Sequence, residues 1–232
     1  MVCFGIILQQ CYQLPQDYLR LGCQVKYSNQ TSVTFMDGYV QKQVDLSQDG
    51  VTLKHEDVNR LAKLYKDVLG SEYIAQVVKG PDISRCRRFY TISVKPCGHP
   101  LSCAPSSTPQ LKAAVRCWIK GLMKLHESGH GHGDIRWPNL IRVKNDHFCV
   151  IDLEGSVCLG SSPTLNPCPK SWRNGEALES GVYTVQSDFW QVGKLLDDTD
   201  LRDDPDGREL CQRILDRNLS GADILLHKWL NP

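Results

Sequence analysis

Residues 130–141 read HGHGDIRWPNLI, so an aspartate, a basic residue and an asparagine stand close together. Transfer of a phosphoryl group from a nucleotide needs a carboxylate that accepts the proton of the attacking hydroxyl and a cation beside the transferred group. We interpret Asp134 as this base and Arg136 as this cation. The reaction also needs an amide and a second carboxylate that hold Mg²⁺ against the phosphates. Asn139, which completes the catalytic set of this loop, and Asp152, at the end of an apolar run, are the predicted Mg²⁺ ligands.

The alternative interpretation of this stretch is a polar turn between two core elements. Each residue taken singly is ordinary in such a turn. The joint pattern favours chemistry, because it combines His-x-Asp-x-x-x-x-Asn, an apolar strand, a short turn and then an apolar pair followed by Asp.

Two parts of different character surround these residues. Up to about residue 96, β-branched and aromatic residues alternate with polar ones, which is typical of strands, and one stretch has helical spacing. A Pro- and Ser-rich linker, CGHPLSCAPSSTPQ, follows, and most of the later chain has helical periodicity. We therefore predict an α+β fold: residues 1–96 form a small antiparallel β part with one helix, and residues 97–232 form a larger, mainly helical part.

The expected elements follow from periodicity and capping residues. The first helix of the larger part begins at the predicted N-cap Thr108 with Pro109 behind it, and Ser187 and Ser220 are the other predicted caps. Two or three strands are expected within 18–28 and 32–44, with polar turns at SNQ and MDG, and residues 2–8 are a candidate first strand. Further strands are expected at 73–80, 89–95, 139–143 and 148–153, and helices at 54–69, 108–125, 187–196 and 220–230.

The composition of the chain limits the classes of binding partner that we expect. The chain has 232 residues, with 27 Lys and Arg against 26 Asp and Glu, and this balance gives no reason to expect a nucleic acid or a membrane as partner. No stretch is apolar enough to span a bilayer, and the opening lacks the basic region and cleavage site of a signal peptide. The 11 cysteines are scattered without a Cys-x-x-Cys pair, so we expect reduced, mostly buried thiols in the cytoplasm or nucleus.

The stretch HGDIRWPN resembles the catalytic loop of the protein-kinase-like superfamily, and IDLE stands where that superfamily has Asp-Phe-Gly. The combination is most similar to the divergent kinase domains of fungi and oomycetes, including those of Crinkler-type effectors. SDFWQVG and ADILLHKWL resemble two later helices of protein kinases. The resemblance implies a two-lobed protein-kinase-like fold that binds ATP and Mg²⁺ between its lobes, near the linker.

In the larger part, the resemblance gives three residues structural roles. Asp188 would brace the backbone of the catalytic loop, and His132 would anchor it. Glu176 occupies the place of the glutamate that ends the activation segment of kinases, with Arg213 or Arg217 as its partner.

In the smaller part, YVQKQVDL resembles the Val-Ala-Ile-Lys strand of protein kinases, which implies that Lys42 binds the α- and β-phosphates. Glu56, or the adjacent Asp57, would be its ion-pair partner. ISVKPCGHPL would be the last strand and the hinge, where backbone groups from Lys95 to Cys97 meet the adenine.

The chain departs from the family pattern at three places. No Gly-x-Gly-x-x-Gly precedes Lys42, and the corresponding turn reads KYSNQTSV. Gly133 replaces the arginine that binds a phosphate on the activation loop of kinases, so we expect no switch by activation-loop phosphorylation. Glu154 replaces the glycine of Asp-Phe-Gly, and the stretch after Asp188 is short, which leaves the substrate class open.

Three functions are compatible with these features. The leading one is an ATP- and Mg²⁺-dependent protein kinase that phosphorylates Ser or Thr of a protein substrate, favoured by the kinase-like C-terminal helices. The second is a small-molecule phosphotransferase of the aminoglycoside or choline kinase kind, favoured by His-Gly-Asp and Ile-Asp-x-Glu. The third is a nucleotide-binding pseudokinase that acts as a binding module, favoured by the missing glycine loop. The acceptor, the mode of regulation and the oligomeric state stay open.

Overall fold

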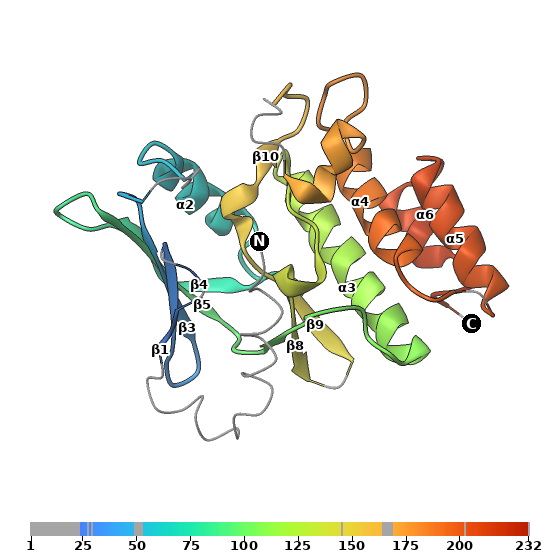
Figure 1. The fold of residues 1–232 in the computed structure, drawn as a ribbon, viewed down its shortest axis with the longest axis horizontal. Coiled ribbons are helices and arrows are strands. Elements are labelled where there is room, and N and C mark those ends of the chain that lie inside the picture. The colour runs from blue at the N-terminus through green and yellow to red at the C-terminus, as the bar shows by residue number, and fades with distance from the viewer. Residues whose placement is uncertain are drawn as a thin grey trace. The chain divides into compact units, whose positions relative to one another are not determined.

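The computed structural model describes residues 24–231 except 27, 29, 49–52, 145, 164–168 and 202. It divides into two compact units, each described here by itself (Figure 1). One unit is Met1–Gly70 with Ala75–Gly98, and the other is Ser71–Ile74 with His99–Pro232. Antiparallel strands and helices occur together, which confirms the α+β class. The strand expected at 2–8 and the start of the one at 18–28 lie outside the described residues.

The first unit is built on a five-stranded antiparallel sheet with the order β1-β2-β3-β5-β4. In its strands, Val, Ile, Thr and aromatic residues alternate with polar residues. This pattern favours a sheet, because one face of the sheet is buried and the other is more exposed. Helix α2 packs against β4 and buries Leu61, Leu64 and Tyr65, which are spaced three and four positions apart as one helix face requires. The elements are β1 (Gln24–Lys26), β2 (Thr31–Phe35), β3 (Val40–Asp45), α2 (Asp57–Asp67), β4 (Gln76–Ile83) and β5 (Phe89–Lys95).

The second unit combines helices with a three-stranded sheet, β6-β8-β9, and a two-stranded pair, β7 and β10. Three short 3-10 turns separate these elements. The elements are β6 (His99–Pro100), α3 (Thr108–Glu127), β7 (His130–Gly131), η2 (Trp137–Asn139), β8 (Leu140–Lys144), β9 (His147–Val150), η3 (Leu153–Gly155), β10 (Val157–Cys158), η4 (Lys170–Gly175), α4 (Val185–Asp197), α5 (Pro205–Leu215) and α6 (Gly221–Leu226).

Helix α3 is the scaffold from which the HGHGDIRWPN stretch emerges. Its residues Trp118, Leu122 and Leu125 are completely buried. Gly121 brings the helix close to β9, because a Cβ added there would lie 2.8 Å from Cγ2 of Val150. The helix that precedes the stretch and the strand that leads to Asp152 are therefore packed directly against each other.

Helix starts show where the sequence prediction held and where it was wrong. Ser220 and Asp223 form the predicted capping box of α6. The cap of α3 is Ser107 and not Thr108, and the cap of α4 is Thr184, with Ser187 one turn inside as the second half of a capping box. Helix α5 was not predicted, although Asp204 caps it through a hydrogen bond to the backbone and a proline follows, which are ordinary start signals.

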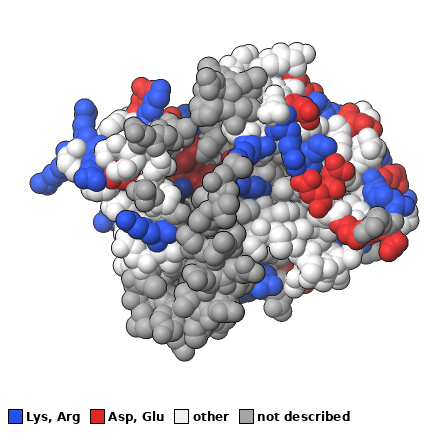
Figure 2. Space-filling model, in the orientation of Figure 1, with Lys and Arg blue, Asp and Glu red and all other residues white. Residues whose placement is uncertain are grey.

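Charges of both signs mix on the surface of the second unit. Over α5 and α6, at the right of Figure 2, blue and red side chains alternate. Lys228, for example, lies 3.0 Å from Asp206 and 3.0 Å from Glu209. No helix in the described part of the chain is both long and apolar enough to cross a membrane.

The described cysteines are free thiols. Cys117, Cys149 and Cys211 are buried, and burial raises the pKa of Cys149 to about 12 and that of Cys211 to about 11. Cys86, Cys103 and Cys158 are exposed and Cys97 is half-buried, so the expectation of mostly buried thiols was wrong for these residues.

Candidate functional site

The Asp134 side chain is the centre of the candidate site, in the loop between β7 and η2. Its Oδ2 accepts a hydrogen bond from Nδ2 of Asn139 at 3.0 Å and lies 2.9 Å from Nε of Arg136. Its Oδ1 accepts a hydrogen bond from Oγ of Ser171 at 3.4 Å. The side chain is 28% exposed, so solvent reaches this carboxylate. The structure thus brings together the three residues predicted from the loop.

The Asn139 side chain has a fixed orientation. Its Nδ2 donates to the backbone oxygen of Asp134 at 2.8 Å as well as to the carboxylate. Both partners are acceptors, so the nitrogen and not the oxygen must face them. Oδ1 of Asn139 accepts no hydrogen bond from any residue in the described part of the chain. Amide and carboxylate oxygens are ligands that Mg²⁺ accepts in proteins, so this oxygen fits the predicted role.

Asp152 is brought to this loop by the residue before it. The N–H of Ile151 donates to the backbone oxygen of Asn139 at 3.0 Å, and the Ile151 oxygen accepts from Nε2 of His132 at 3.0 Å. Asp152 itself has φ +68°, a left-handed conformation that Asp tolerates better than most residues. The backbone therefore places Asp152 beside the loop, and its ligation of Mg²⁺ stays a prediction.

The His132 ring links the backbone after β7 to the backbone after β9. Nδ1 accepts from the backbone N–H of Asp134 at 3.2 Å, while Nε2 faces the Ile151 carbonyl. Because the first partner only donates and the second only accepts, the ring is held as the neutral tautomer with its proton on Nε2. The residue is completely buried, with its ring edge-on to Trp118.

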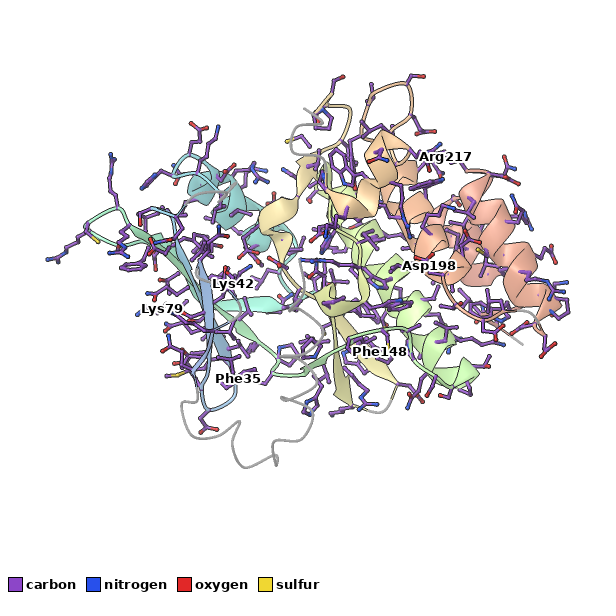
Figure 3. All side chains as sticks on the ribbon, viewed as in Figure 1. Phe35, Lys42, Lys79, Phe148, Asp198 and Arg217 are labelled. Carbon is purple, nitrogen blue, oxygen red and sulfur yellow. The ribbon has the colours of Figure 1, made fainter. Side chains whose placement is uncertain are left out.

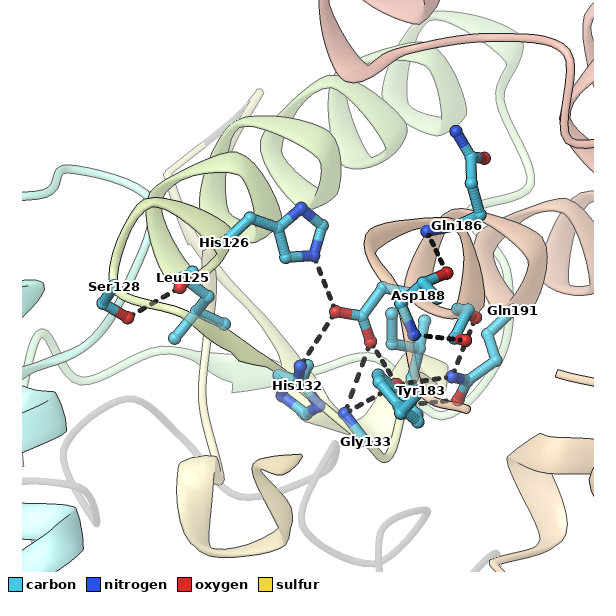
Figure 4. A network of polar contacts seen from close by, with 12 residues as sticks. Leu125, His126, Ser128, His132, Gly133, Tyr183, Gln186, Asp188 and Gln191 are labelled. Carbon is cyan, nitrogen blue, oxygen red and sulfur yellow. Dashed lines mark hydrogen bonds and ion pairs between the residues drawn. The ribbon is translucent and has the colours of Figure 1, made fainter. Parts of the chain in front are cut away.

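Asp188 lies on α4 and holds the backbone of the loop (Figure 4). Its Oδ2 accepts from the N–H of His132 at 2.9 Å and from Nε2 of His126 at 2.8 Å. Its Oδ1 accepts from the N–H of Gly133 at 3.3 Å and from the Tyr183 hydroxyl at 2.5 Å. Complete burial acts to raise the pKa of Asp188, but the hydrogen bonds and charge of His126 and the hydroxyl of Tyr183 outweigh it and lower the pKa.

Tyr183 and Gln191 extend this network and were not predicted. The Tyr183 hydroxyl accepts from the N–H of Gly133 at 3.1 Å and from Nε2 of Gln191 at 2.9 Å. Oε1 of Gln191 accepts from the N–H of Ile135 at 3.3 Å. Burial, and then the charge of Asp188, raise the pKa of Tyr183 well above its ordinary value. Gln191 follows Asp188 by three positions on one helix, so helical spacing could have identified it.

Gly133 has a steric reason to be glycine. Its φ is +79°, and a Cβ added there would lie 2.3 Å from the backbone oxygen of Gly155. Its own oxygen accepts a hydrogen bond from the indole Nε1 of Trp172 at 2.7 Å. The position that carries an arginine in the family pattern therefore has no room for any side chain here. Trp172, which is buried, was not predicted either.

Arg217, one of the two predicted partners of Glu176, binds the backbone of this residue. Nη2 of Arg217 donates to the backbone oxygen of Glu176 at 2.7 Å and to that of Ala177 at 3.0 Å. Arg213, the other predicted partner, lies 3.9 Å from Glu209. Arg217 thus fixes the backbone at residues 176 and 177 rather than pairing with the Glu176 carboxylate.

In the first unit, Lys42 lies in the middle of β3, opposite Ile92 of β5. Directly opposed residues of antiparallel strands point to the same face, so Lys42 shares a face with the buried residues Val44 and Ile92. Lys42 is labelled in Figure 3. Glu56 precedes α2, is 78% exposed and lies 3.7 Å from Nζ of Lys54. A contact between Lys42 and Glu56 stays a prediction.

The other predicted residues of the first unit lie in α2 and at the end of β5. Asp57, the alternative partner for the lysine, lies 3.3 Å from Nη2 of Arg60. Lys95 is the last residue of β5, and Cys97 lies two positions after it. Burial, and then the charge of Asp37, raise the pKa of the Cys97 thiol. Their contact with adenine stays a prediction.

Comparison with known proteins gives one informative similarity. No model of a known protein family matches the chain. The chain is 29% identical over 111 residues to Crinkler effector protein 8 of Phytophthora infestans, an alignment that covers 45% of this chain and 18% of that protein. The chain therefore spans less than a fifth of the length of this relative, and the similarity indicates an oomycete effector-like relationship.

Proposed function

We propose that the chain is an ATP- and Mg²⁺-dependent protein kinase with a protein-kinase-like fold, which transfers the γ-phosphate to a Ser or Thr hydroxyl. The observation that carries the proposal is that the two carboxylate oxygens of Asp134 have different partners. Oδ2 faces the amide of Asn139 and the guanidinium of Arg136. Oδ1 receives a hydroxyl, the group that a kinase must deprotonate.

In this mechanism, Asp134 accepts the hydroxyl proton on Oδ1 while the amide of Asn139, by a hydrogen bond, and the guanidinium of Arg136, by its charge, keep Oδ2 in place. Such a base must lie within hydrogen-bond reach of the proton that it removes. Arg136 places a cation beside the carboxylate, where negative charge on the transferred group needs compensation. Bound Mg²⁺ would neutralise phosphate charge, and Asn139 and Asp152 would hold it.

The resemblance adds roles for the first unit. Lys42, with Glu56 as partner, is proposed to bind the α- and β-phosphates, and the backbone from Lys95 to Cys97 the adenine. The network around Asp188 supports the large-unit part of the proposal, because a catalytic loop must be held rigidly to orient its base. We place the activity inside a cell, where free thiols such as Cys149 stay reduced.

The test has two stages. The first measures whether ATP raises the melting temperature of the chain only when Mg²⁺ is present. The second measures transfer of labelled γ-phosphate to casein, myelin basic protein, kanamycin and choline. Asp134→Asn should abolish most of the transfer, and Asp146→Asn, at an exposed turn outside the site, is the matched control.

Each result has a defined meaning. Transfer to protein acceptors that Asp134→Asn removes would support the kinase. Transfer to kanamycin or choline alone would replace it with a small-molecule phosphotransferase, and nucleotide binding without any transfer would replace it with a pseudokinase. A chain that binds no nucleotide would contradict all three.

A further inference from the structure

The turn between β4 and β5 carries positive charge that has no part in the proposed mechanism. It reads SRCRRF over residues 84–89, with three arginines and no acidic residue. Arg85, Arg87 and Arg88 are all exposed. The turn extends beyond the rest of the sheet, at the left of Figure 1, and Lys and Arg side chains gather at this end of the first unit in Figure 2. The first unit therefore presents a compact group of guanidinium ions to solvent.

Arg88 has an ionic partner within the unit. Its Nε donates to both carboxylate oxygens of Asp45 at 3.1 Å, and its Nη2 donates to Oδ2 of Asp45 at 2.7 Å. Its guanidinium carbon lies 5.0 Å from the centre of the Phe89 ring. The Arg88 guanidinium holds the pKa of the Asp45 carboxyl well below its usual range, so Asp45 stays ionised at neutral pH. The charge of Arg88 is thus balanced by that of Asp45.

Arg85 and Arg87 have no such partner. Neither guanidinium forms an ion pair or a hydrogen bond with any residue that the structure describes. A guanidinium ion offers paired N–H donors in a fixed geometry that matches the two oxygens of a carboxylate. Two such groups, separated by one residue of the turn, are therefore open to anionic groups of another molecule.

The backbone of the turn is fixed by hydrogen bonds. The N–H of Arg87 donates to the backbone oxygen of Ser84 at 2.8 Å, and the N–H of Phe89 donates to Oγ of Ser84 at 3.0 Å. Nε2 of His55, which precedes α2, lies 2.7 Å from the backbone oxygen of Arg87 and must carry a proton, because a carbonyl only accepts. Since the backbone is ordered in advance, the two arginines lose less conformational freedom when a ligand binds.

Arg87 lies at a position of the turn that favours glycine. Its φ is +58°, in the left-handed region. A side chain is unfavourable there, and hairpin turns commonly place Gly or Asn at such positions. Backbone strain of this kind is concentrated at sites that bind or react. The arginine side chain therefore indicates a role in binding, because folding alone would favour glycine.

We propose that Arg85 and Arg87 form a docking site for an acidic peptide segment of a partner protein, whose Asp and Glu carboxylates pair with the two guanidinium ions. Arginine clusters recognise acidic motifs in this way. Two guanidinium ions are few for a nucleic acid, whose backbone binding commonly involves about 6–10 phosphate contacts. They are also few for an anionic membrane, which attracts clusters of about 4–8 basic residues. The site lies in the first unit, and the proposal does not depend on kinase activity.

The test measures binding of a fluorescein-labelled peptide of alternating Asp and Glu to the whole chain, by fluorescence anisotropy at about 0.15 M NaCl. The peptide should bind, and a matched peptide of Asn and Gln should not. The double substitution Arg85→Gln and Arg87→Gln should weaken binding about tenfold or more, because charge-assisted hydrogen bonds are lost. The matched control is Lys63→Gln with Lys66→Gln, which removes the same charge from exposed positions of α2 and should leave binding unchanged.

Three results would overturn the proposal. The first is equal affinity for the acidic and the neutral peptide. The second is unchanged binding of the acidic peptide after the double arginine substitution. The third is tighter binding of single-stranded RNA, or of vesicles that contain phosphatidylserine, through the same two arginines, which would assign the turn to another class of partner.

Arg87→Gly separates binding from folding. It should raise the melting temperature by about 1–3 °C, because glycine adopts the left-handed backbone without strain, and it should weaken binding of the acidic peptide. A gain in melting temperature together with weaker binding would support the docking site. A variant that binds the peptide as tightly as the parent would show that the arginine is not needed there and would overturn the proposal.

Cys86 is an internal reporter, because it is exposed and lies between the two arginines. Its contact with Ser84 lowers the pKa of the thiol, which favours the reactive thiolate. Saturating acidic peptide should slow alkylation of Cys86 by iodoacetamide several-fold. Alkylation of Cys103 and Cys158, which are exposed in the second unit, should keep its rate. An unchanged rate at Cys86 would show that the peptide binds elsewhere and would overturn the proposal.

Discussion

The indole N–H of Trp172 donates a hydrogen bond to the backbone oxygen of Gly133 at 2.7 Å. This contact joins residues that are 39 positions apart and ties η4 to the loop that carries Asp134. In the kinase loop that this stretch resembles, the position of Gly133 carries an arginine. Here η4 is attached to the loop by a neutral hydrogen bond and a buried ring.

Trp172→Phe should destabilise the chain, because it keeps an aromatic ring and leaves the buried Gly133 oxygen without this donor. Loss of one partner of a buried hydrogen bond costs about 1–3 kcal/mol. Trp118→Phe is the matched control, since Trp118 is fully buried and its Nε1 has no hydrogen-bond partner among the described residues. Urea unfolding should give a free-energy loss that is larger for Trp172→Phe by this amount. Equal losses would show that the hydrogen bond contributes nothing.

Gly133→Ala should be much more damaging than a glycine substitution at an open position. A Cβ at 133 would lie 2.3 Å from the Gly155 oxygen, whereas Gly129, with a similar φ of +77°, has no atom within 4 Å of an added Cβ. Both variants carry the left-handed backbone penalty of about 1–2 kcal/mol. The clash should cost Gly133→Ala a further ~1–3 kcal/mol, measured by thermal unfolding of the two variants side by side. A smaller loss for Gly133→Ala than for Gly129→Ala would contradict the close approach of the two loops.

The acid sensitivity of the chain should depend on Asp188. Its pKa is lowered in the folded state, so its contribution to stability is present above its unfolded pKa of about 3.9 and is lost as the pH falls through the lower folded value. Asp188→Asn should therefore be less stable at pH 7 and should lose less stability between pH 5 and pH 2 than the parent. Asp146→Asn, at an exposed turn, should retain the parent profile. Parallel pH profiles for Asp188→Asn and the parent would argue against this lowered pKa.

Asp134→Asn and Asp152→Asn should fail in different ways. The first should leave Mg²⁺-nucleotide binding near that of the parent and lower kcat by about 10²–10⁴-fold, because it removes the proposed base, which would act in the transition state. The second should weaken binding of the metal and the nucleotide directly, since it removes a predicted ligand. Calorimetric titration with a non-hydrolysable ATP analogue, together with initial rates, distinguishes the two effects. Weakened nucleotide binding in both variants would remove the separate role of Asp134.

Lys42→Ala should raise the KM for ATP, because the lysine is predicted to meet the α- and β-phosphates. Lys79→Ala is its control: Lys79 is exposed on β4 and pairs with Ser93, which points to the opposite face of the sheet from Ile92. Both lysines are labelled in Figure 3. Steady-state kinetics with varied ATP should show at least a tenfold increase in KM for Lys42→Ala alone. An unchanged KM would exclude Lys42 as the phosphate-binding lysine.

The sequence was most informative where the interacting residues are close in the chain. Asp134, Arg136 and Asn139 could be predicted together because five positions of loop join them, and their side chains do meet. Most of the strand and helix order was also readable, because periodicity is a local property, but helix α5 and the short strands β6, β7 and β10 were missed. Asp188 was found only through a resemblance, since the loop residues that it binds, His132 and Gly133, lie 55 or more positions earlier.

Tyr183 and Trp172 were missed for a related reason. Each makes its hydrogen bond to Gly133 across 50 and 39 positions respectively, and neither belongs to a motif with a known spacing. The atom that Gly133 offers to Trp172 is a backbone oxygen, which every residue has, so residue types carry no signal of the contact. The same applies to Arg217, which binds the backbone oxygen of Glu176 where a carboxylate was expected.

The close approach of Gly133 to the Gly155 oxygen restricts how this chain can evolve. An arginine at position 133 would need the 155 carbonyl to retreat first, so a single substitution that restored the residue of the family pattern would damage folding before it could introduce a new control. Compensating changes around residue 155 would have to be accepted earlier, when they bring no benefit of their own. Glycine at position 133 is therefore hard to replace in a single step, and descendants of this chain should retain it as long as the residue 155 carbonyl keeps its place.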